Sequence, residues 1–314
     1  MKRILILLLL AVTSQAFAQY EYPDKELCEE LKKRTLAIQL LEETGDTEKN
    51  LNNALKKIFA EWDLTPVEFM GWDAIAEILD SKNTSYALLL QNDELRKDIR
   101  SREVDQYGRK VVGATDPNSN KMAFKQYYEA FTFSYYNFDL LLTTKKKEKS
   151  ITSVGFANGD LSRIDYVFLY QQLSRLIQSS LNDIPTDEFY NVASNIETCK
   201  NSKLVLLRDF FSEKDVPKID DYYEFEYELV DFESYQDVIL NKAENMSYSK
   251  IIWSNQINMY EWVVVDAKSG SILSQLTFGG VKFGRNHDAN DIIKSKHLKY
   301  ITNKTAQKVN NKYK

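Results

Sequence analysis

Apolar residues recur at helical spacing through the first third of the chain. Between residues 51 and 62 they form one stripe along a helix. Just before it, Gly45 is placed to end a preceding helix and Asp46 to cap the start of this one. The segment Thr65-Pro66-Val67-Glu68 then has the pattern of a capping box with proline at the first helical position. We therefore expect residues 24–100 to be mainly helical, with a less regular last helix near residues 85–100.

The period changes to two residues after about residue 110. Phe131, Phe133 and Tyr135 alternate with polar residues, and the phase reverses at Tyr135-Tyr136, which predicts a β-bulge there. Helical spacing returns at residues 162–181 and 234–245. Further strands are predicted at 151–156, 203–211, 222–230, 250–254, 261–266 and 272–278.

Helices first, followed by mostly antiparallel strands with inserted helices, predict an α+β fold. The chain divides into a signal peptide (1–18), a helical N-terminal region (19–110), an α+β region with an antiparallel sheet (111–281) and a basic C-terminal tail (282–314). No repeat of 20 to 50 residues is visible.

The N-terminus has the three parts of a secretory signal. Lys2 and Arg3 are followed by the apolar run 4–12, and then by Ala16 and Ala18 at the small-residue positions of a cleavage site. As a helix, the run spans only about 14 Å, too short for a bilayer. We expect cleavage after Ala18, no transmembrane segment, and a mature protein exported to the periplasm or the exterior.

Composition narrows the protein class. The chain has 314 residues, 43% of them hydrophobic and 28% charged, which excludes a disordered or multi-span membrane protein. The formal charge is −5, yet residues 282–314 carry nine lysines and arginines against two aspartates. A basic tail on an acidic body is not typical of nucleic-acid binding. We expect this tail to be frayed from about Lys294 onward, or to attach weakly to an anionic surface.

Residue types that carry common catalytic chemistry are scarce. The two histidines, His287 and His297, both lie late in the chain, and two distant cysteines do not complete a zinc site. No phosphate loop, dinucleotide fingerprint or zincin helix is present. The sequence therefore predicts no metal and no cofactor, and it leaves open whether the protein is an enzyme.

An acidic stretch is the main chemical anomaly. Eleven acids lie between Asp209 and Asp237, and Glu224, Glu226 and Glu228 alternate with Phe225, Tyr227 and Leu229. In a strand the three glutamates share one face, each about 7 Å from the next. They predict a cation site, a paired-carboxylate hydrolase, or simply a solvated face that protects a sheet edge.

Aromatic residues make up 12% of the chain, with 19 tyrosines among them. Tyr135 and Tyr136 put one ring on each side of a strand, which indicates either sheet packing or an exposed binding face for a partner such as a glycan. We expect an exported, non-catalytic ligand- or partner-binding protein, with Glu224, Glu226, Glu228, Tyr135 and Tyr136 as candidate binding residues. The alternative is a carboxylate-dependent hydrolase acting outside the cytoplasm.

The two cysteines, Cys28 and Cys199, predict one disulfide. Export sends the chain to a compartment where disulfides persist, and a bridge would link the helical N-terminal region to the second half.

Overall fold

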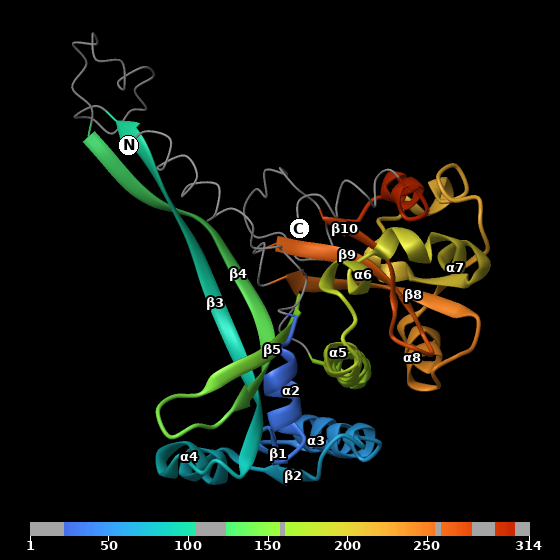
Figure 1. Ribbon diagram of the computed structural model, residues 1–314. Helices are drawn as coiled ribbons and strands as arrows, with labels where there is room; N and C mark the ends of the chain where they lie inside the picture. Colours follow the sequence, from blue (N-terminus) through green and yellow to red (C-terminus); the bar gives the residue numbers. More distant parts are fainter. Residues whose placement is uncertain (1–21, 105–123, 158–160, 255–258, 278–292, 305–314) are drawn as a thin grey trace, which may run out of the picture.

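The computed structural model describes residues 22–104, 124–157, 161–254, 259–277 and 293–304; the side chains of residues 93–104, 124–135, 259 and 277 are not described. It shows an α+β fold built on one ten-stranded, mostly antiparallel sheet, as predicted (Figure 1). The elements of the first half are α2 (Lys25–Leu31), β1 (Thr35–Gln39), α3 (Asp46–Phe59), β2 (Val67–Met70), α4 (Trp72–Ser81), β3 (Tyr86–Val104), β4 (Phe124–Leu142), β5 (Lys149–Phe156) and α5 (Arg163–Leu181). Those of the second half are α6 (Thr186–Phe189), η1 (Val192–Asn195), α7 (Ile196–Asn201), β6 (Lys203–Leu207), η2 (Arg208–Phe210), η3 (Val216–Lys218), β7 (Tyr227–Val230), α8 (Phe232–Leu240), β8 (Met246–Ser254), β9 (Met259–Asp266), β10 (Ile272–Thr277) and η5 (Ser295–Tyr300).

The sheet consists of two half-sheets with the same topology. The first has the strand order β2-β1-β3-β4-β5 and the second β7-β6-β8-β9-β10. In each, the first three strands are mutually parallel and the last three are antiparallel neighbours. The half-sheets join where β5 pairs with β8.

The match between the halves extends to register and to local backbone geometry. Lys82 and Lys242, 160 residues apart, lie just after α4 and α8 in the left-handed region, with φ of 51° and 48°. The registers of β4 with β5 and of β9 with β10 each shift by one residue, at Ile151 and at Leu273. The chain is thus built from two units that share the order strand, crossover, strand, helix and three strands; the crossover contains α3 in the first unit and the 3-10 helices η2 and η3 in the second.

The helices cover the two faces of the first half-sheet unequally. Leu36, Ile38 and Leu89 face the main core together with residues of α2, α3 and α5. Ala37 and Leu88 face the other way and pack under α4, as alternation along a strand requires. In the second unit α8, the counterpart of α4, lies on the main-core face beside α5, so α5 bridges the units.

A buried ion pair marks this bridge. Lys250 of β8 donates to Asp165 in the first turn of α5, and both side chains are about nine-tenths buried. Asp165 also accepts from the backbone N–H and the hydroxyl of Ser162, 2.7 Å away in each case, which completes a capping box. The charge of Lys250 is therefore partnered inside the core.

Three segments that were expected to be helical are strands. The Thr65 hydroxyl donates to the carbonyl of Arg34, and the Pro66 carbonyl accepts from the N–H of Leu36 at 2.8 Å. These contacts draw residues 67–70 into the sheet as β2, and the helix begins only at Trp72. Tertiary pairing therefore overrides a local capping signal.

The other two are β1 and β3. Leu88, Leu89 and Leu90 are all buried because β3 is covered on both faces here. Their continuous apolar run therefore lacks the alternation of apolar and polar residues that identifies a half-buried strand in a sequence. The predicted boundary at residues 110 and 111 falls between β3 and β4, which pair along their whole length and form the long ribbon in Figure 1. The bulge expected at Tyr135-Tyr136 is also wrong: the β3–β4 register shift lies at Asp98/Ile99.

The described part of the basic tail, residues 293–304, is docked rather than frayed. Leu298 and Ile301 are fully buried in the core of the second unit, around the 3-10 helix η5. The expectation of a mobile segment from Lys294 onward is therefore wrong for residues 294–301. The signal peptide, His287 and residues 305–314 lie outside the described residues.

Candidate functional site

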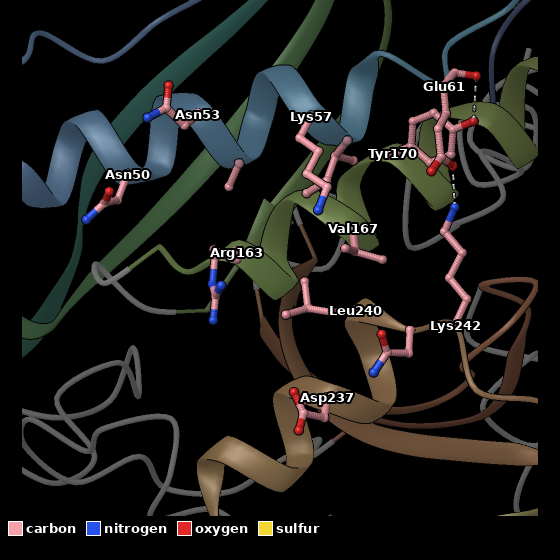
Figure 2. Close-up of a pocket in the computed structure, with 13 residues that line it drawn as sticks. Asn50, Asn53, Lys57, Glu61, Arg163, Val167, Tyr170, Asp237, Leu240 and Lys242 are labelled. Carbon is pink, nitrogen blue, oxygen red and sulfur yellow. Dashed lines mark hydrogen bonds and ion pairs between the residues drawn. The ribbon is translucent and has the colours of Figure 1, made fainter.

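A groove of about 740 Å³ opens at the junction of the two units, between α3, α5 and α8 (Figure 2). α3 and α5 belong to the first unit and α8 to the second, so neither unit could form the groove alone. The lining residues are Asn50, Asn53, Ala54, Lys57, Ile58, Glu61, Arg163, Val167, Tyr170, Asp237, Leu240, Asn241 and Lys242.

Helix α3 supplies one wall because its two faces differ. Asn52, Leu55 and Phe59 are buried on the face toward the sheet. The Asn52 carboxamide pairs with both backbone groups of Leu41, at 2.9 and 3.0 Å, which ties the middle of the helix to the segment that follows β1. The groove side then presents the exposed polar residues Asn50, Asn53 and Lys57 above half-buried Ala54 and Ile58.

One end of the groove is closed by a cluster around Tyr170 of α5. The Tyr170 hydroxyl donates to the Glu61 carbonyl at 3.2 Å, and the Lys242 ammonium pairs with the Glu61 carboxylate. The same ammonium lies 5.5 Å from the centre of the Tyr170 ring, a cation–π distance. Burial raises the pKa of Tyr170, so its phenol stays protonated and can donate. Figure 2 shows these three residues together at one side of the site.

The open part of the groove is amphipathic. Val167 and Leu240 lie at its floor, and Arg163 stands at the rim with its guanidinium 3.1 Å from the Gln236 side chain. Within the described part of the chain, the Lys57 ammonium has neither a hydrogen-bond nor an ion-pair partner. A cation with nothing to neutralise it, next to an apolar floor, favours a ligand with an anionic group and an apolar body.

The acids of the groove are not arranged as a catalytic pair. Glu61 is bound by Lys242, while Asp237 lies on α8 and away from Glu61 in Figure 2. Among the described residues, no group of three or more histidine, cysteine or acidic side chains could hold a metal ion. The two carboxylates of the groove, Glu61 and Asp237, therefore do not converge on one point.

The predicted binding residues lie elsewhere. Glu224, Glu226 and Glu228 are exposed, but only Glu228 belongs to β7, where it pairs with Lys203 at 2.7 Å. Tyr136 is half-buried against the main core, and the side chain of Tyr135 is not described. Glu224, Glu226, Glu228 and Tyr136 do not line the groove, and the roles of all five residues in binding stay predictions.

The predicted disulfide is not formed. Cys28 and Cys199 are free thiols, both fully buried, and they belong to two different core clusters. Burial raises the pKa of the Cys28 thiol, and that of Cys199 to about 12. Export alone could not predict pairing, because it says nothing about which face of the sheet each helix covers.

Sequence reasoning missed the groove because its three helices are far apart along the chain. A weak signal was available: Asn50, Asn53 and Lys57 recur at helical spacing beside the apolar stripe and so share one polar face.

Comparisons with protein-family models, with curated proteins and with solved structures find no match to this chain. Within the described ranges, no helix combines the length and the apolar character needed to cross a membrane.

Proposed function

We propose that this is an exported, non-catalytic binding protein, and that its ligand is an amphipathic molecule whose anionic group lies near Lys57. The junction groove carries the proposal. Its volume falls in the range of small-molecule sites, and it combines an apolar floor with polar groups at the rim. The signal-like residues 1–18 support export.

Non-catalytic binding is supported by the arrangement of the acids. A carboxylate-dependent hydrolase needs two carboxylates that converge on one bond. In the groove, Glu61 is held by Lys242, and Glu224, Glu226 and Glu228 lie outside it. Because the two walls come from different units, a bound ligand would also hold the units together and raise the thermal stability of the whole chain.

Thermal unfolding with octanoate, octyl phosphate and octyl glucoside tests this function. The two anionic probes should raise Tm, and the uncharged glucoside should raise it less. At one hundred times Kd the gain is about 2.7 kcal/mol. Lys57→Glu should abolish the gain, whereas Lys56→Glu, an exposed neighbour on α3 outside the groove, should keep it. Equal responses of the two variants, or no response to either anion, would refute the assignment.

A further inference from the structure

Two large apolar side chains are exposed at equivalent places in the two units. Trp72 is 56% exposed and Phe232 is 45% exposed. Each is the first residue of the helix that follows an outermost strand, α4 after β2 and α8 after β7, and the two positions are 160 residues apart. Tyr300, the third large aromatic residue exposed among the described side chains, has no such context.

Each of these residues stands beside an open sheet edge. Among the described residues, β2 pairs only with β1, and β7 only with β6. The outer side of each strand therefore presents backbone N–H and C=O groups that another strand could pair with. Glu68 and Glu228 occupy the same register position in the two strands, and both are exposed.

Acids dominate the chain segments that contain the two edges, although Lys203 of the neighbouring strand β6 pairs with Glu228 and Lys242 pairs with Glu61. Residues 59–81 contain six acids and no lysine or arginine, and residues 219–241 contain eight acids and none. Asp73 and Glu233, each one position after the exposed aromatic, are equivalent and exposed. An aromatic face next to carboxylates is the surrounding that a lysine or arginine side chain prefers.

We propose that β2 with Trp72 and β7 with Phe232 are two equivalent docking edges for an extended, lysine- or arginine-rich segment of a partner protein. The segment adds as a further strand through backbone hydrogen bonds, which is a common mode of peptide recognition. Its cationic side chains lie against the aromatic ring and the acids that flank it. This surface is separate from the junction groove, because neither strand nor either aromatic residue lines that groove.

Titration of the intact protein with a short synthetic peptide that alternates lysine and valine tests the proposal. Calorimetry should find two peptides per chain, with affinity that falls as salt increases. Trp62, Trp253 and Trp262 are at least 93% buried, so a shift in tryptophan emission reports on Trp72. Trp72→Ala should abolish that shift and weaken one site about fivefold, and Phe232→Ala should weaken the other site to the same extent. Tyr300→Ala, the matched exposed-aromatic control, should change neither site.

A second peptide separates strand addition from simple charge attraction. It has the same sequence with N-methyl groups on alternate backbone nitrogens, which keeps the charge and removes the donors that face the edge. Loss of binding supports the docking edges. Equal binding of both peptides, or affinities unchanged in the Trp72→Ala, Phe232→Ala double variant, would overturn them. So would binding of a neutral oligosaccharide, rather than the peptide, that depends on Trp72.

Discussion

Gly155 of β5 and Trp253 of β8 are register partners at the only place where β-pairing joins the two half-sheets within the described residues. A Cβ atom on Gly155 would lie 2.5 Å from the Trp253 carbonyl oxygen and 3.3 Å from Cδ1 of its indole ring. The nearer atom belongs to the backbone of a central strand, so it cannot move aside without disturbing the sheet. The junction of the units therefore depends on the absence of a side chain at residue 155.

Gly155→Ala should consequently destabilise the protein. We expect the free energy of unfolding to fall by about 1–3 kcal/mol, the usual effect of overpacking a tight site. Chemical denaturation measures this loss. Ser150→Ala, on an exposed part of the same strand, should stay within about 0.5 kcal/mol of the wild type. If Gly155→Ala left the free energy of unfolding unchanged, β5 and β8 would not be this close.

The ion pair between Lys250 and Asp165 gives a second test of the junction. Lys250→Met leaves the Asp165 carboxylate buried without its cation and should lower stability by about 3 kcal/mol. The double variant Lys250→Met, Asp165→Asn removes the buried charge and should recover part of the loss. Denaturation of the two variants and of Asp165→Asn completes a double-mutant cycle. If the changes in the free energy of unfolding of the two single variants simply added up in the double variant, a direct ion pair would be contradicted.

The sequence predicts elements well where one face is buried and the other solvated. Helix α3, which has one buried and one exposed face, follows the predicted segment for that reason. Helix α5 and strands β6, β9 and β10 also follow their predicted segments, although they are buried on both faces. Prediction fails where tertiary contacts decide, as at Thr65 and Pro66, and where a continuous apolar run fits a helix as well as a strand, as at Leu88–Leu90. The spacing of apolar residues shows which face of an element is buried, but it does not show which other element buries that face.

The duplication and the groove could not be predicted from the sequence, for a related reason. Between residues 67–92 and 227–252, only Glu68/Glu228 and Lys82/Lys242 are identical. The two units share a pattern of strand, helix and register, and many sequences satisfy the same pattern. The groove then depends on how one unit packs on the other, which no local pattern specifies.

The cysteines should behave as two unreactive thiols. In the folded protein, burial and raised pKa keep both thiols protonated and shielded, so a disulfide-exchange reagent should modify neither quickly at neutral pH. After denaturation without a reductant, alkylation should add two groups per chain, as mass spectrometry would show. A chain that accepts alkylation only after reduction would reinstate the Cys28–Cys199 bridge.

His297 in η5 should make stability depend on pH. Its Nδ1 accepts a hydrogen bond from the Lys294 N–H at 3.2 Å. Burial first, and then the nearby ammonium groups of Lys296 and Lys294, lower the pKa of His297 to about 4, against roughly 6.5 in an unfolded chain. The unfolded state therefore binds a proton more readily, and the free energy of unfolding falls as the pH drops from about 6.5 toward 4.

Denaturation across this pH range should show the loss of stability. The variant His297→Asn can still accept the hydrogen bond from Lys294 and should flatten the dependence of stability on pH. Lys296→Gln removes one repelling charge, so it should raise the His297 pKa measured by NMR. An unchanged profile in His297→Asn would assign the pH dependence to other groups.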